Sequence, residues 1–326
     1  MDSNESASQA QGALLLSPPS TEQTTITTKN TKTSTYSCNF LQHLIDHSIY
    51  PDGYEYPDGR ISALPDNWDE INERLMQRRP SLSPSRFTND DFRKFKREDN
   101  HAISEDDPVI KKAVSIIEGK GSGDPKCTGG GYPLNNFASL TDSNLATARP
   151  DCFDGARPEQ LDRQIREELS NLIIPSNQGD RPIVLNFFLE LKGPKGLLDI
   201  GKQQACYDGA LGARAIYALQ LYEQEMPICD NNAYTITSTY SSGTLKLYTT
   251  HITHTGRPDC RPEYIMTQLR AFAMTDTPET FRQGASAYRN ARDWAKEKRD
   301  EIIRLANERH LNGQLSTPRA NGYSSK

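Results

Sequence analysis

A glutamate and a lysine two residues apart are the side chains in this sequence whose types and spacing could do chemistry. The run IVLNFFLELK occupies positions 183–192 and ends in Glu190 and Lys192. Residues two apart on a β-strand project from the same face, so a carboxylate and an ammonium would reach one point in space. A carboxylate can hold Mg²⁺, and an ammonium can orient water or stabilise charge on a phosphoryl group. The spacing therefore predicts half of a metal-dependent hydrolytic site. The alternative is an ion pair at a strand end, worth less than about 1 kcal/mol if exposed.

A metal site of this kind needs a second acid from an adjacent strand or loop. The segment ARPDCFDG at 148–155 offers Asp151 and, after it, Asp154. Asp180 lies ahead of Glu190 in the same part of the chain and is the third choice. We expect Asp151, Glu190 and Asp154 to be the metal ligands.

The order of these residues resembles that of the PD-(D/E)XK nuclease superfamily. Pro150-Asp151 and Glu190-Leu191-Lys192 stand as its two motif halves, in the order helix, Pro-Asp, strand ending in Glu-x-Lys, helix, strand. The resemblance implies that Asp151 and Glu190 bind Mg²⁺ and that Lys192 assists the attacking water. It further implies a phosphodiester hydrolase whose partner is a nucleic acid, DNA or RNA. Pro-Asp also occurs at 51–52, 57–58, 65–66 and 258–259, so the position ahead of the Glu-x-Lys strand is what selects Asp151.

The segment that follows the strand extends this resemblance. Gln203 and Tyr207 have a QxxxY spacing similar to that of RecB-type members, which use the pair near the active site or the nucleic-acid strand. Residues four apart share one helical face, so ordinary packing of the helix on a sheet explains the pair equally well. Roughly residues 95–310 also resemble a family of uncharacterised fungal proteins, in runs such as NFFLELKGP, QACYDGALGAR and NNAYTIT.

Apolar periodicity predicts the elements that position these residues. In the strand at 183–192, odd positions are wholly apolar, whereas even positions include Asn186 and end in the charged Glu190 and Lys192. Small residues such as Gly209 and Gly212 predict a helix that lies close to a sheet. The segment AYTITSTYSSGTLKLYTTHIT predicts a β-hairpin around SSG. Two helices are expected to finish the fold, the last from Pro278 to about Arg309.

Composition along the chain predicts its organisation. Residues 1–36 and 312–326 are rich in Ser, Thr, Asn and Gln without apolar periodicity and are expected to be disordered. Residues 37–95 are expected to form a helical N-terminal extension with a linker, and residues 96–311 the PD-(D/E)XK-like domain. The predicted fold is therefore α/β, with a restriction-endonuclease-like mixed sheet flanked by helices, extra N-terminal helices and a long C-terminal helix.

The totals exclude some function classes. The net charge is −5, so the whole chain generates no basic field, although a local basic groove is compatible with that total. Six cysteines occur singly, which indicates reduced thiols. The sequence has neither a secretory leader pattern nor a run of roughly 20 apolar residues. We expect an intracellular protein, nuclear or cytoplasmic, that does not enter a membrane; its oligomeric state is left open.

Other candidate sites are weaker. His251 and His254 are three apart in a predicted strand and point to opposite faces, so they do not suit a zinc site with Cys229 and Cys260. Basic residues of the last helix, including Arg292 and Arg299, alternate with acids. They predict a solvated face, or alternatively a rim that contacts nucleic acid. A catalytically inactive nuclease fold used as an interaction or regulatory module is the alternative to the enzyme.

Overall fold

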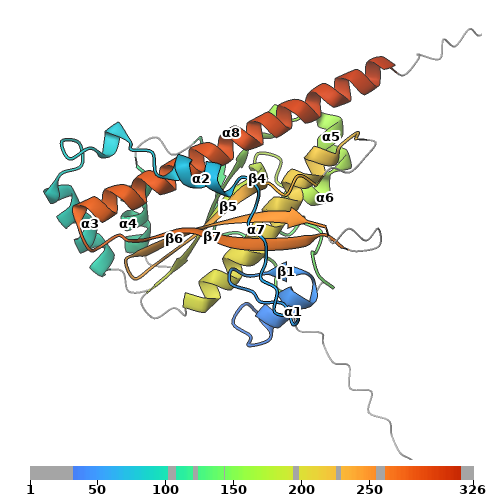
Figure 1. The fold of residues 1–326 in the computed structure, drawn as a ribbon. Helices are drawn as coiled ribbons and strands as arrows, with labels where there is room; N and C mark the ends of the chain where they lie inside the picture. The colour runs from blue at the N-terminus through green and yellow to red at the C-terminus, as the bar shows by residue number, and fades with distance from the viewer. Residues whose placement is uncertain are drawn as a thin grey trace, which may run out of the picture. The chain divides into compact units, whose positions relative to one another are not determined.

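The computed structural model describes residues 32–101, 108–119, 124–142, 144–193, 198–224, 229–254 and 261–316 (Figure 1). Of the two segments predicted to be disordered, 1–36 and 312–326, residues 1–31 and 317–326 lie outside the described residues, whereas residues 312–316 are helical, which corrects that prediction. None of the described helices combines the length and the apolar composition that a membrane crossing needs.

A seven-stranded mixed sheet forms the centre of the described chain, in the order β1-β7-β6-β5-β4-β3-β2. The β1–β7 and β4–β5 pairs are parallel, and the other neighbours are antiparallel. The strands are β1 Ile49–Tyr50, β2 Thr128–Gly129, β3 Cys152–Ala156, β4 Ile183–Lys192, β5 Ala233–Ser241, β6 Thr244–Thr253 and β7 Glu263–Ala273.

Eight α-helices within the described residues accompany the sheet, so the prediction of an α/β protein with a mixed sheet and a long C-terminal helix is confirmed. They are α1 Phe40–Asp46, α2 Trp68–Leu75, α3 Asn89–His101, α4 Pro108–Glu118, α5 Arg163–Glu168, α6 Ser170–Ile173, α7 Leu198–Leu221 and α8 Pro278–Ser316. The boundary predicted between residues 95 and 96 lies inside α3.

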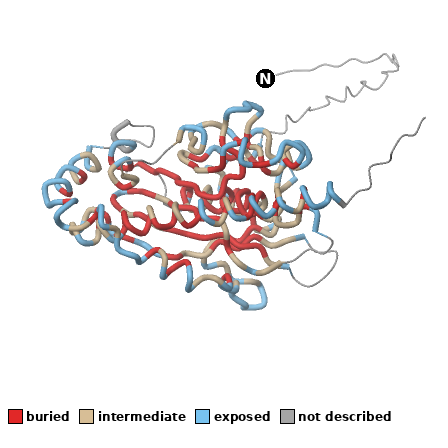
Figure 2. Tube along the Cα trace, turned by 90° about the horizontal axis from the view of Figure 1, so that it is seen from above, coloured by how far each residue is buried: buried red, intermediate tan, exposed pale blue. Residues whose placement is uncertain are grey.

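The sheet separates two main apolar cores. In one core, β4 packs with α8 and with the helices α2, α3 and α4. In the other, β4 packs with α7 and α1. The most buried backbone runs through the middle of the sheet and the helices against it (Figure 2). A group on β4 therefore faces either α7 or α8, and this choice decides which site it can join.

The two faces of β4 alternate as predicted only in its second half. Phe187 and Leu189 belong to the α8 core, whereas Phe188 belongs to the α7 core. In the first half, Leu185 packs on the α7 side although the alternation predicted it beside Phe187. The neighbouring strand β3 shifts register here, and Val184 has a positive φ of 52°. Such a bulge exchanges the faces that successive residues occupy.

The predicted hairpin is confirmed, because β5 and β6 are joined by a tight turn. Ser242 and Gly243 both have positive φ, 47° and 73°. Two positive φ values are typical of the type I′ turn that matches strand twist.

One prediction about the helices is wrong. The chain does not finish with two helices, because residues 263–273 form β7. Their apolar positions suit a helix and a strand equally, and ten paired positions with β6 settle the choice in favour of the strand. Residues 158–173 form a short 3-10 turn followed by α5 and α6, because the Asp162 side chain accepts a hydrogen bond from the Gln164 backbone N–H and starts a new helix.

Candidate active site

Three acids and a lysine lie together near the carboxyl end of β4. Glu190 and Lys192 project from the face of β4 that carries α7, and the Lys192 Nζ atom lies 3.3 Å from Glu190 Oε2. Asp208 reaches Glu190 from α7, and Asp151 immediately precedes β3. Glu190, Lys192 and Asp208 are only 2%, 4% and 2% exposed. The strand therefore ends in a buried, charged cluster rather than in a surface ion pair.

The Asp151 side chain is joined to the backbone of β4. Its Oδ2 atom accepts a hydrogen bond of 2.7 Å from the N–H of Leu191. The last residue of β3 paired with β4 on this side is Cys152, opposite Leu189. The next backbone acceptor that could continue this ladder is the carbonyl of Pro150, but it already accepts a hydrogen bond of 2.8 Å from the N–H of Gly131. The Asp151 carboxylate thus continues the β3–β4 ladder beyond the last backbone pair and is fixed beside Glu190.

Burial controls the protonation of this cluster. Removal from water raises the pKa of Glu190 well above its usual range, and the charges of Asp208 and Asp151 raise it further, against the opposing effect of Lys192. Burial likewise raises the pKa of Asp208 to about 7. The two carboxyls are hydrogen-bonded to each other, which requires a proton between them. The cluster therefore retains at least one proton near neutral pH in the absence of a cation.

Two contacts fix the Lys192 side chain. Its Nζ donates a 3.0 Å hydrogen bond to the carbonyl oxygen of Leu191. A Cβ at position 201, on α7, would lie 3.0 Å from the Lys192 Cγ atom. Gly201 thus leaves room for the lysine stem between strand and helix.

Asp208 is a site residue that sequence reasoning missed. It shares a helical stripe with Ala205, Gly212 and Ala215, which are all buried against the sheet. An acid on a stripe of small, sheet-facing residues was the available signal. Its Oδ2 atom is buried and receives no hydrogen bond from a donor in the described residues.

The structure does not bring the other two acids to this cluster. Asp154 pairs in register with Phe187 and faces the α8 side of the sheet, where its carboxylate contacts Arg292, with a 3.2 Å hydrogen bond from Nη2 to Oδ1. Asp180 is exposed and precedes β4 at its amino end, so the whole length of the strand separates it from Glu190. Of the three acids considered, only Asp151 lies beside Glu190.

The pair Gln203 and Tyr207 lies on α7 as the spacing predicts. Tyr207 is 6% exposed and packs edge-to-face against Phe40 of α1, with ring centroids 6.2 Å apart. It also hydrogen-bonds Ser139. These contacts are those of a residue that packs α1 on α7. Gln203 is half-buried one turn earlier.

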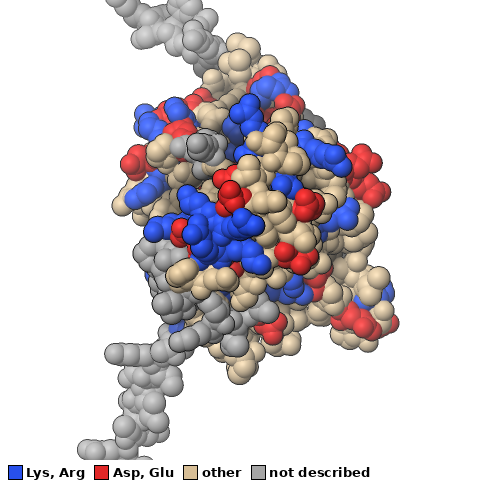
Figure 3. All heavy atoms as spheres, turned by 90° about the vertical axis from the view of Figure 1, so that its left-hand side faces the viewer, with Lys and Arg blue, Asp and Glu red and all other residues tan. Residues whose placement is uncertain are grey.

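A cleft of about 1400 Å³ lies on the opposite, α8 side of the sheet. Eight Lys or Arg and five Asp or Glu residues line it among the described residues. Lys and Arg side chains gather on the face that carries α3 and α4 (Figure 3). The net −5 of the whole chain thus coexists with a locally basic surface.

The basic residues of α8 form the predicted solvated face only in part, because Lys296 is exposed whereas Arg289, Arg292 and Arg299 are half-buried or buried. Arg299 is 2% exposed, and one of its terminal nitrogens, Nη1, hydrogen-bonds Asn186 of β4. Arg289 donates to the carbonyls of Ile117 and Ile116 at 2.8 and 2.9 Å, at the end of α4. The prediction failed at these two positions because the sheet covers Arg299 and α4 covers Arg289.

The histidines considered for zinc do not form a metal site with the described cysteines. His251 is buried in β6, and burial lowers its pKa to about 4. His254 lies beyond the strand, with Nε2 3.1 Å from the hydroxyl of Tyr217. Cys229 donates to the carbonyl of Ile252, and Cys260 lies outside the described residues.

Comparison of the chain with protein-family models, with curated proteins and with solved structures finds no match. The geometry of the chain itself is therefore the basis for any function proposed for it.

Proposed function

We propose that the protein is a Mg²⁺-dependent phosphodiester hydrolase of restriction-endonuclease-like fold, with its centre at Asp151, Glu190 and Lys192. The observation that carries the proposal is the hydrogen bond between Asp151 and the Leu191 backbone, which holds an acid from β3 beside the Glu-x-Lys end of β4. The connections support it as well. The antiparallel pair β3–β4 is followed by the crossover α7 and by β5, parallel to β4.

The donor set fits a hard divalent cation. Mg²⁺ prefers oxygen ligands and keeps several waters, so one or two carboxylates are enough to hold it. Glu190 and Asp151 would be those ligands, and the Asp208 Oδ2 atom offers a further buried oxygen. The oxygens of these three acids do not all lie within 4.8 Å of one another among the described residues. Binding is therefore expected to draw the carboxylates together and to displace the shared proton.

The residues of the chain have separate roles in this proposal. When bound, Mg²⁺ would stabilise negative charge on a phosphoryl oxygen and favour ionisation of a coordinated water. Lys192, fixed against Leu191 and Gly201, would orient that water or stabilise the developing charge. Tyr207 positions α7 through its contacts with α1. Asp154 lies across the sheet and has no part in this centre.

Cleavage assays with the full chain test the proposal. Labelled single-stranded and double-stranded DNA and RNA are incubated with Mg²⁺ or Mn²⁺. Glu190→Gln and Lys192→Met should each lower the rate at least 100-fold, since each removes a charge from the reacting centre. Asp180→Asn, at the exposed far end of β4, is the matched control and should cleave at the wild-type rate. Equal cleavage by wild type and Glu190→Gln would show that the activity belongs elsewhere.

A second candidate function is binding of a phosphate-bearing ligand such as nucleic acid by a catalytically inactive fold. The observation that favours it is Arg299, which lines the basic cleft, forms no ion pair among the described residues, and has a buried Nε atom without a partner. A buried cation without a carboxylate partner is costly, and an anion in the cleft would offset that cost.

Binding measurements separate the two functions. Fluorescence anisotropy with a labelled single-stranded oligonucleotide should give at least tenfold weaker binding for Arg299→Met. Arg304→Gln is the control, because Arg304 lies on the same helix but is exposed and paired with Glu301 and Glu308. If the affinity of the wild type falls with rising salt but Arg299→Met binds the oligonucleotide as tightly as the wild type does, the binding site lies outside this cleft.

A further inference from the structure

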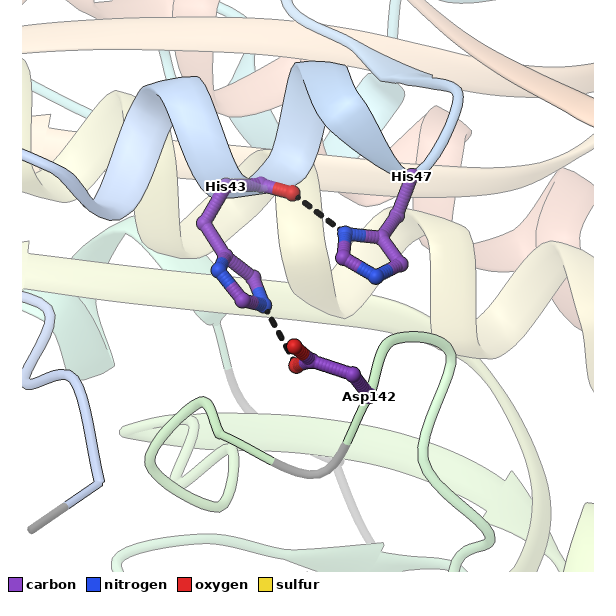
Figure 4. Close-up of side chains that lie close together, drawn as sticks. All are labelled: His43, His47 and Asp142. Atoms are coloured by element: carbon purple, nitrogen blue, oxygen red, sulfur yellow. Dashed lines mark hydrogen bonds and ion pairs between the residues drawn. The ribbon is translucent and has the colours of Figure 1, made fainter. Parts of the chain in front are cut away.

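Two histidines and an aspartate converge outside the β4 cluster. His43 lies in the last turn of α1, His47 caps that helix, and Asp142 lies in the loop that precedes β3. One ligand atom from each lies within 4.8 Å of the other two, and no other such group of three occurs within the described ranges. Figure 4 shows both rings on the same side of α1, with the carboxylate pointing toward His43.

The helix positions the two rings. Residues at i and i+4 share a helical face, and the rings of His43 and His47 stack with centroids 4.6 Å apart and planes 25° apart. The Nε2 atom of His43 lies 2.9 Å from Asp142 Oδ1. Asp142 comes from a distant part of the chain, which is why the sequence alone does not indicate the group.

Hydrogen bonding fixes the form of His47 that a metal requires. Its Nδ1 atom lies 2.8 Å from the carbonyl oxygen of His43. A carbonyl oxygen only accepts, so Nδ1 carries the hydrogen and Nε2 of the neutral ring keeps its lone pair. A backbone carbonyl that holds the other ring nitrogen is typical of histidines that bind metals. A simple ion pair between His43 and Asp142 would engage only two of the three groups.

We propose that His43, His47 and Asp142 bind a divalent transition-metal ion, with Zn²⁺ the best fit. Two imidazole nitrogens and one carboxylate oxygen, with water in the fourth position, form a donor set that Zn²⁺ accepts. Mg²⁺ prefers an all-oxygen set, so this site is chemically distinct from the β4 cluster. Zinc bonds of about 2.0–2.1 Å place tetrahedral ligands about 3.4 Å apart. The His43–Asp142 contact of 2.9 Å must open slightly, and the exposed Asp142 can supply that movement.

The position of the site indicates a structural role. Phe40 and Leu44 of α1 are buried in the same core as α7. A metal held by α1 and Asp142 would tie that helix to the loop that leads into β3. Zinc should therefore raise the thermal stability of the full chain, and the effect does not depend on the proposed hydrolase.

Metal titration of the purified full chain tests the site. Zn²⁺ is titrated by competition with a chromophoric chelator, and Co²⁺ is titrated by absorption spectroscopy. We expect a tetrahedral Co²⁺ spectrum without a thiolate charge-transfer band, which excludes binding by the cysteines. Zinc binding should weaken at least tenfold in His47→Ala and in Asp142→Asn.

Two comparisons make the result decisive. His101→Ala, which alters an exposed histidine at the end of α3, should bind Zn²⁺ like the wild type, and excess Mg²⁺ should not compete. Asp142→Asn changes an exposed loop residue, and a metal-free thermal midpoint equal to that of the wild type shows that its loss of zinc is not due to unfolding. Wild-type zinc affinity in both ligand variants, or no zinc binding by the wild type, would overturn the proposal.

Discussion

The carboxylate of Asp151 completes the hydrogen-bond ladder of β4 by accepting the backbone N–H of Leu191 at 2.7 Å. Asp151 is thereby joined both to the sheet and to the charged cluster, because Glu190 directly precedes Leu191 on β4. In the proposed metal centre, the same acid would bind the ion and would also hold the strand end in position.

Asp151→Ala should therefore affect stability as well as any activity. It leaves the N–H of Leu191 without its acceptor in a buried strand, which costs about 1–3 kcal/mol. Chemical denaturation should show this loss in the absence of metal. Asp180→Ala provides the comparison, and equal unfolding free energies for the two variants would show that the Asp151 contact contributes nothing.

The pH dependence of stability should carry the signature of Asp208. Its pKa is about 7 in the folded protein, against a usual value of 3.8. The folded state thus holds a proton that the unfolded state releases, so stability is lost as pH rises from about 4 to 7. Asp208→Asn removes this effect. The difference in unfolding free energy, variant minus wild type, should rise by up to about 1.4 kcal/mol per pH unit between pH 4 and 7 and should level off above pH 7. Parallel curves for the two proteins would contradict the assignment.

Close packing of α7 on the sheet gives a third prediction. A Cβ at Gly212 would lie 2.8 Å from the Phe188 ring and 3.0 Å from the carbonyl oxygen of Leu185. Alanine favours a helix by about 1 kcal/mol over glycine, but overpacking costs about 1–3 kcal/mol. Gly212→Ala should thus be neutral to destabilising by about 2 kcal/mol. Gly179→Ala, which meets no atom within 4 Å, should be neutral or slightly stabilising. A gain in stability for Gly212→Ala would show that α7 does not lie this close.

The buried pair of Asn186 and Arg299 should be strongly coupled. Asn186 Nδ2 donates to the carbonyls of Tyr234 and Ala295 at 2.9 and 2.8 Å, and its Oδ1 accepts from Arg299. Asn186→Leu alone leaves the Arg299 cation without this acceptor and should cost about 3–5 kcal/mol. Adding Arg299→Met should recover part of that loss. Additive effects in a double-mutant cycle would rule out the coupling.

The sequence predicts the strands and helices whose apolar period is unambiguous. The strand 183–192 and the hairpin around Ser242-Gly243 have clear alternation, and Pro278 marks the start of α8. The segment 263–273 has apolar residues at positions that fit either period, such as Ile265, Leu269 and Phe272. Pairing with β6 decides its structure, and that information is not local.

The same distinction holds for the sites. Glu190 and Lys192 are close in sequence, so the geometry of one strand is enough to predict that they meet. Asp208 and Asp142 join their groups only through tertiary packing, and the sheet directs Asp154 to its other side. Residue type and spacing within one element can be derived from the sequence, whereas convergence between elements cannot.

The central claim is tested most directly by calorimetric titration of the full chain with Mg²⁺ at pH 7, in two buffers of different protonation enthalpy. Because Glu190 and Asp208 share a proton, we expect binding with net proton release, seen as a buffer-dependent enthalpy. Binding should be lost in Glu190→Gln and kept in Asp180→Asn. Unaltered Mg²⁺ binding by Glu190→Gln, or no binding by the wild type, would contradict a metal centre at the end of β4.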